Sequence, residues 1–130
     1  MKNHLIILLS ILLLSCSNKT DLNKSPLHEN LIGFKASFLA ELGEKEYFKL
    51  EKKLNNQKLD IKYINDIIYV SFYEELNGCG QYRGNLEYSG DTINLKTELI
   101  SDEVCSSTSI DKLTFLIDNP DRKKKIIFKN

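Results

Sequence analysis

The chain has 130 residues, and its 18 basic side chains balance its 18 acidic ones. Because this balance offers no electrostatic attraction for a phosphate backbone, we expect no nucleic-acid partner. The length suffices for one small domain with a modest core.

The first fifteen residues have the composition of a secretory signal peptide. An apolar run over residues 5–14 follows a single lysine, and it is shorter than the roughly 20 residues that cross a membrane. The run ends in Leu13-Leu14-Ser15-Cys16, which resembles the lipobox of bacterial lipoproteins. This resemblance implies cleavage between Ser15 and Cys16 and a lipid thioether on Cys16, whose thiolate is the nucleophile. The alternative is an ordinary signal peptide with a cysteine there by chance.

Lipidation of Cys16 predicts a protein anchored in the membrane of the cell envelope. Two or three acyl chains hold a protein on a bilayer essentially permanently, since each buried methylene contributes about 0.8 kcal/mol. Ser17 stands where the enteric sorting rule has the aspartate of inner-membrane retention, which favours the outer membrane. Residues 16–30 are then interpreted as a lipidated, flexible tether, because most of them up to Pro26 are polar.

Residues 31–130 are predicted to form a single all-β domain. Residues 31–42 fit two structures, a strand or a short N-terminal helix. The alternation of Phe34, Ala36 and Phe38 with polar neighbours favours a strand, although the apolar residues also fit one side of a helix. We favour the strand.

Alternating apolar and polar residues then predict a series of short strands joined by tight turns. These strands are expected over residues 48–54, 58–63, 67–73, 82–88, 92–99, 113–117 and 126–128. Polar turns or loops are expected at residues 55–57, 65–66, 77–80, 89–91, 101–109 and 118–121. Seven or eight short strands in this order predict an antiparallel meander curled into a small barrel or sandwich.

Cys79 and Cys105 are the two cysteines that remain after Cys16 is lipidated. In an oxidising compartment an even pair is expected to form a disulfide. The alternative is a reactive thiol pair, but the Cys-x-x-Cys spacing typical of such pairs is missing.

Residues that carry catalysis are scarce in this sequence. His28 is the one histidine of the mature chain and lies in the tether, so a Ser-His-Asp or Cys-His site has no base. Neither Glu74-Glu75 nor Asp102-Glu103 has the spacing of calcium ligands or glycosidase carboxylates. We therefore expect no enzyme, no cofactor and no metal site.

Residues 77–84 carry the richest local chemistry. Gln81, Tyr82 and Arg83 form a candidate recognition surface here, because tyrosine and arginine are enriched at binding hot spots and the nearby glycines permit close approach. The alternative is a disulfide-bonded start of a strand with turn glycines.

The run from Gly78 to Cys105 is similar to META-type lipoprotein domains. In both, a Gly-Cys pair precedes a glycine-containing hairpin and a later cysteine. The chain departs from the family pattern at Gly80, where those domains have asparagine after the first cysteine. The similarity covers about 28 residues, and no function is carried over from it.

Two functions fit these features. The first is a lipid-anchored, non-enzymatic binding module of the cell envelope that holds a small ligand or an envelope component. The alternative is a protein–protein inhibitor or immunity lipoprotein that protects the envelope. A cavity between the sheets would favour the first, and a contiguous exposed patch around Tyr82 and Arg83 would favour the second.

Overall fold

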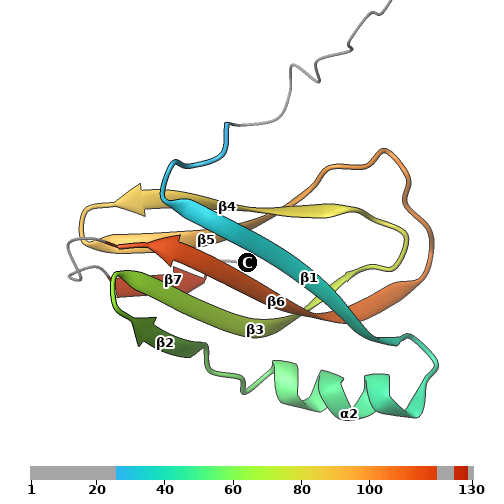
Figure 1. Cartoon of the computed structure of the whole chain (residues 1–130). Helices are drawn as coiled ribbons and strands as arrows, with labels where there is room; N and C mark the ends of the chain where they lie inside the picture. The colour runs from blue at the N-terminus through green and yellow to red at the C-terminus, as the bar shows by residue number, and fades with distance from the viewer. Residues whose placement is uncertain (1–25, 120–124, 129–130) are drawn as a thin grey trace, which may run out of the picture.

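The computed structural model describes residues 26–119 and 125–128. The predicted signal peptide, its cleavage site at Ser15 and Cys16, and the first part of the tether lie outside the described residues. The described chain forms seven strands and one helix (Figure 1). These are β1 (Leu31–Glu41), α2 (Lys45–Leu54), β2 (Asp60–Ile64), β3 (Ile67–Asn77), β4 (Tyr82–Ser89), β5 (Thr92–Leu99), β6 (Thr108–Asp118) and β7 (Lys125–Phe128).

The strands form two sheets, so the prediction of a β fold is confirmed, and the helix α2 makes the domain mostly β instead of all-β. The first sheet has the order β1-β6-β3-β2 with antiparallel neighbours, and the second has the order β4-β5-β7. The two sheets are open, and the described strands do not close into a barrel.

The predicted antiparallel meander is wrong in two respects. Among the described strands, only β2–β3 and β4–β5 are hairpins of sequence neighbours, because β6 inserts between β1 and β3. In addition, β7 runs parallel to β5. β6 takes a central place because it presents apolar side chains on both faces, such as Ile110 on one and Phe115 on the other. Local alternation reports which residues form strands, but it carries no information on such distant pairing.

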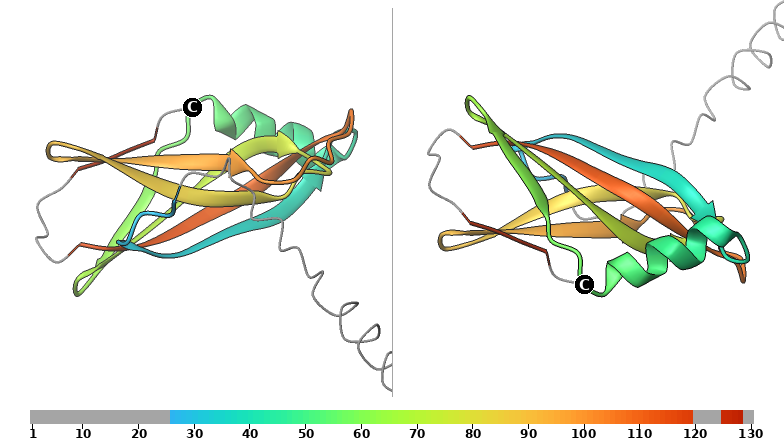
Figure 2. Two further views of the ribbon diagram at one scale, coloured as in Figure 1. Left: turned by 90° about the horizontal axis from the view of Figure 1, so that it is seen from above. Right: turned by 90° about the horizontal axis from the view of Figure 1, so that it is seen from below.

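The helix is not where the sequence suggested it. Residues 31–41 form strand β1, as we favoured, whereas residues 45–54 form α2 instead of the predicted strand. Lysine, glutamate and leucine are good helix formers, and Tyr47, Leu50 and Leu54 recur at helical spacing. This face packs on Ala40 and Ile110, on the outer side of the first sheet. Figure 2 shows α2 at the end of the molecule where β1 finishes and β6 begins.

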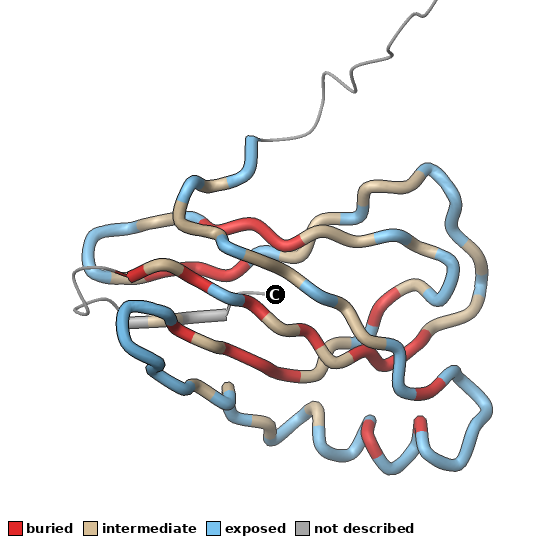
Figure 3. The backbone as a smooth tube through the Cα atoms, in the orientation of Figure 1, coloured by how far each residue is buried: buried red, intermediate tan, exposed pale blue. Residues whose placement is uncertain are grey.

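The main core lies between the two sheets. Its buried members are Ile68, Val70, Phe72, Leu76, Leu86, Ile93, Leu95, Leu113, Phe115 and Ile117. Figure 3 shows these buried stretches along β3, β4, β5 and β6. The Phe115 ring packs edge-on against Phe34, with 4.9 Å between centroids. Gly84 faces this pair, and a Cβ there would overlap both rings, so only glycine lets β4 approach so closely.

Two predicted turns are confirmed by their backbone. Asn65 links β2 to β3 with φ at 53°, and Gly90 links β4 to β5 with φ at 55°. Asparagine and glycine are the residues that best tolerate this left-handed region. No helix within residues 26–119 is long and apolar enough to cross a membrane.

Candidate functional site

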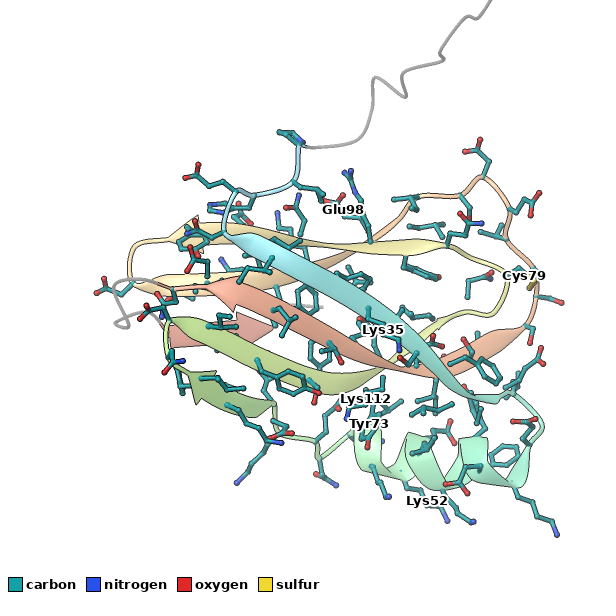
Figure 4. All side chains as sticks on the ribbon, viewed as in Figure 1. Lys35, Lys52, Tyr73, Cys79, Glu98 and Lys112 are labelled. Carbon is teal, nitrogen blue, oxygen red and sulfur yellow. A yellow bond between two sulfur atoms is a disulfide. The ribbon has the colours of Figure 1, made fainter. Side chains whose placement is uncertain are left out.

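A disulfide joins Cys79 to Cys105, as the sequence predicted. It links the turn after β3 to the loop before β6, with 5.6 Å between the two Cα atoms. Figure 4 marks Cys79 at the end of the molecule opposite the β2–β3 and β4–β5 turns. We call this end the disulfide end.

Asn77 organises the disulfide end through its side chain. Its Nδ2 donates to the carbonyl of Cys105 at 2.5 Å. Its Oδ1 accepts from the backbone N–H groups of Cys79 and Cys105, both at 3.1 Å. Gly78 N–H also donates to the carbonyl of Ser107 at 2.9 Å. The turn and the loop are therefore held by a covalent bond, by three hydrogen bonds of the Asn77 side chain and by one backbone hydrogen bond.

A cleft of about 510 Å³ opens at this end, between β1 and the start of β4. It is lined by Phe34, Lys35, Ala36, Phe38, Leu76, Asn77, Gly78, Gly80, Tyr82, Ser109 and Asp111. Ser109 and Asp111 are buried residues of β6 and form its floor, whereas the exposed Phe38 ring stands at its rim.

The cleft exists because the inner face of the first sheet changes composition along its length. The paired residues on this face are, towards the disulfide end, Phe72–Leu113, Glu74–Asp111 and Leu76–Ser109. Large apolar pairs therefore give way to pairs with a polar member. Gly80, just before the facing strand β4, also lines the cleft and adds no side chain to it.

Asp111 is the charged group of the cleft floor. Its residue surface is only 9% exposed. Ser109 donates its hydroxyl to Asp111 Oδ1 at 2.7 Å, and the described residues offer no second hydrogen bond to this carboxylate. Burial of a carboxylate is costly unless it is paired or hydrogen-bonded. The floor of the cleft thus presents an acceptor whose hydrogen-bonding capacity is only partly used.

Glu74 is the register partner of Asp111 and lies on the same face. Its Oε2 accepts a hydrogen bond from the Thr97 hydroxyl of the second sheet at 2.9 Å. Burial raises the pKa of Glu74, and the hydrogen bond from Thr97 offsets part of this rise. Of these two register partners, Asp111 lines the cleft, whereas Glu74 is bonded to the Thr97 hydroxyl of the second sheet.

The residues of the predicted recognition surface are divided by the structure. Tyr82 lines the cleft, and its hydroxyl accepts from the Asn77 N–H at 2.7 Å. Arg83 points to the other face of β4, where its Nη2 lies 2.6 Å from Glu98 Oε2. Gln81 is exposed just before the strand. Tyr82 and Arg83 thus belong to different surfaces, and the recognition role of the three residues stays a prediction.

Sequence reasoning missed Phe38, Ser109 and Asp111 as functional candidates. The sequence does contain a signal for Asp111. Alternation along the strand places this residue on the same face as the buried Leu113 and Phe115. A charged residue in the apolar phase of a strand indicates either a strand end or a polar group facing inwards.

Other chemistries find little support among the residues that the structure describes. Residues 26–119 contain no group of three or more His, Cys, Asp or Glu side chains that could hold a metal ion. His28 lies away from the cleft and stacks on Tyr88, with 4.3 Å between ring centroids. The cleft therefore has the means to bind by shape, apolar contact and hydrogen bonding.

Known proteins give no guide to the function of the cleft. No protein-family model, curated protein or solved structure matches this chain. The resemblances to a lipobox at Cys16 and to META-type domains between Gly78 and Cys105 therefore stay predictions.

Proposed function

We propose that this protein is a lipid-anchored module of the cell envelope that binds a small ligand without catalysing a reaction. The cleft at the disulfide end is the observation that carries the proposal. Its volume of about 510 Å³ falls within the roughly 300–1,000 Å³ of small-molecule sites. Its lining combines the aromatic rings of Phe34, Phe38 and Tyr82 with polar side chains such as Asn77, Ser109 and Asp111.

The rim and the floor of the cleft offer different contacts to a ligand. Phe34, Phe38 and Tyr82 offer apolar and aromatic surface, and aromatic contacts supply most of the binding energy in many sites. Ser109 and Asp111 offer the polar contacts that orient a ligand. This arrangement supports a ligand with an apolar body and one polar end.

The disulfide end supports binding because it holds one wall of the cleft in place. Asn77, Gly78 and Gly80 line the cleft and belong to the turn that the disulfide and its hydrogen bonds fix. A wall that is already ordered reduces the entropy that binding costs.

Membrane attachment is the second part of the proposal and rests on the lipobox. Pro26 is the tenth residue after Cys16, and an extended chain of this length reaches at most about 35 Å. The domain would then stay close to the bilayer. Expression in a bacterium with the lipoprotein pathway should yield a protein that begins at Cys16 and carries acyl mass. A Cys16→Ala variant should lack this mass and wash off membranes, and a wild-type protein that behaves in the same way would contradict the anchor.

A fragment screen tests the binding role. Amide NMR spectra of the oxidised mature chain, with Cys16→Ser to prevent lipidation, are recorded with a library of small aromatic fragments. We expect the fragments that bind to shift amides around Phe34, Phe38 and Tyr82. Phe38→Ala should weaken them, because it removes an exposed rim ring. Phe48→Ala is the matched control, since it removes an exposed ring from α2, away from the cleft. Equal losses in both variants would contradict the proposal.

A protein–protein inhibitor or immunity lipoprotein is the second candidate. It is favoured by exposed apolar residues on the outer face of the first sheet, where Ile64 pairs with Ile67 and Leu116 pairs with Tyr69. An Ile64→Ser variant should then lose a protein partner that the wild type captures by cross-linking in envelope extracts. Failure of the wild type to capture any partner would contradict this candidate.

A further inference from the structure

We propose that the cleft selects small organic cations, with Asp111 as the counter-charge for a ligand ammonium group. This inference rests on the proposed function, since it names the class of ligand that the cleft would hold. It follows from the partly satisfied carboxylate at the floor, from the lack of a basic partner among the described residues and from the aromatic rim.

Among the described residues, only one oxygen of the Asp111 carboxylate accepts a side-chain hydrogen bond. The Ser109 hydroxyl donates to Oδ1, which leaves Oδ2 without a donor among the described residues. The residue is more than nine-tenths buried and lines the cleft, so water reaches it only from that side. A ligand donor at Oδ2 would complete the hydrogen bonding of the carboxylate, and a charged donor gives the stronger bond.

The lysines nearest to this carboxylate are Lys112 and Lys35, and neither forms an ion pair with it. Lys112 follows Asp111 on β6 and therefore points to the opposite face of the sheet. Lys35 also lines the cleft, but it alternates along β1 with Phe34 and Ala36, which places its side chain on the outer face of the sheet. None of the ion pairs among the described residues involves Asp111. The described fold thus leaves the buried charge without a cation of its own.

The rim of the cleft indicates the shape and the charge of the ligand. Phe38 is 60% exposed and is the direct register partner of Asp111 on β1. An ammonium group near such a ring gains a cation–π attraction, and the ring also covers an apolar ligand body. An anion is disfavoured, because the Asp111 carboxylate lines the cleft and would repel it.

The test compares three probes of nearly equal size on the oxidised mature chain with Cys16→Ser. The probes are phenethylammonium, the neutral 3-phenylpropanol and the anionic 3-phenylpropionate, each titrated at pH 7 and followed by amide NMR. We expect phenethylammonium to bind on the order of tenfold more tightly than the alcohol, which corresponds to a charge-assisted hydrogen bond. The carboxylate should bind most weakly.

Variants assign this preference to one residue. Asp111→Asn should reduce the preference for the amine over the alcohol to about one, and the exposed turn variant Asp91→Asn should retain it. If Asp111→Asn fails to fold, the carboxyl ¹³C signal of Asp111 in the wild-type sequence gives a second readout. That signal should shift with the amine and not with the alcohol.

The outcomes separate this inference from the proposed function. Equal binding of amine and alcohol in the cleft would overturn the cation preference and leave the binding role intact. An amine preference that survives Asp111→Asn would also overturn it. If none of the three probes shifted the cleft amides while other fragments did, the cation class would again be wrong. If no fragment at all shifted them, the binding role itself would fall.

Discussion

The two ends of the facing sheets are built from the same strands and differ in what fills the space between them. At the turn end, β3 and β6 pair Ile68 with Ile117 and Val70 with Phe115, and all four side chains are buried. At the disulfide end, the same two strands pair Glu74 with Asp111. The register between β3 and β6 is continuous, so on these two strands the change follows side-chain composition, while β1 also carries an irregularity between Phe38 and Ala40 at the disulfide end.

This difference separates the source of stability from the site of binding. Apolar burial stabilises the turn end, at about 25 cal/mol for each Å² removed from water. Between the sheets, the disulfide end has the polar pair Glu74–Asp111 in place of apolar pairs, although α2 packs a second apolar cluster on the outer side of the first sheet there. The Cys79–Cys105 bond and the Asn77 hydrogen bonds hold the turn and the loop beside the cleft.

The largest effect is expected when the packed region loses an aromatic ring. Phe115 is fully buried and contacts the rings of Phe34 and Phe72, so Phe115→Ala should lower the unfolding free energy by about 3–5 kcal/mol. Phe38→Ala removes the same ring from the exposed rim and should change it by no more than about 0.5 kcal/mol. Urea denaturation of both variants measures the contrast. Similar losses would mean that the cleft rim is part of the core.

Loss of the disulfide should come next in size. The bond closes a loop of 26 residues, and in the chain-entropy model its removal costs about 3–4 kcal/mol. A Cys79→Ala/Cys105→Ala variant should therefore unfold at lower urea. Hydrogen exchange should also become faster in the turn and loop of the disulfide end than around Val70 and Phe115. A uniform increase along the whole chain would contradict the division between the two ends.

Removal of the Asn77 side chain should have a smaller effect with the disulfide left intact. Asn77→Ala takes away one donor and one acceptor that serve Cys79 and Cys105, and we expect a loss of about 1–3 kcal/mol. Asn77→Asp keeps the acceptor and should lose less. Thermal denaturation under oxidising conditions compares the two variants, and equal losses would show that the shared acceptor is not what matters.

The smallest effect concerns the pH dependence of Glu74. Because its pKa is raised in the folded protein, its contribution to stability is fully present below the unfolded pKa of about 4.3 and is lost as pH rises through the folded value. Glu74→Gln stays neutral, so its stability relative to the wild type should be greater at pH 7 than at pH 4. Thr97→Val removes the hydrogen bond that lowers the pKa of Glu74. The pKa of Glu74 should then rise further, and the stability of this variant should depend more strongly on pH than that of the wild type. Denaturation at both pH values measures these differences, and a Gln variant with no pH-dependent advantage would contradict the burial of the charge.

Local features of this fold were predictable from the sequence. Asn65 and Gly90 mark the hairpin turns because they tolerate positive φ, and the even pair of cysteines indicated the disulfide. The helix α2 was missed because Phe48, Leu50 and Leu54 also fit a two-residue period. Tyr47 is buried through contacts with a distant part of β6, which a local pattern does not contain.

The cleft was beyond sequence reasoning for a related reason. Its floor depends on β6 lying between β1 and β3, and the meander that we expected would have given β6 other neighbours. Asp111 and Phe38 are 73 residues apart in the sequence and meet only through this pairing. Arg83, which we predicted from the sequence as a recognition residue, lies instead on the opposite face of β4 and forms a salt bridge with Glu98.

A crystal structure of the oxidised mature chain grown with phenethylammonium tests the central claim most directly. The account predicts density for the amine between β1 and the start of β4, with its nitrogen within hydrogen-bonding distance of Asp111 Oδ2 and its ring against Phe38. A cleft that is closed by the approach of the two sheets, or an amine bound on another surface while the cleft stays empty, would contradict it.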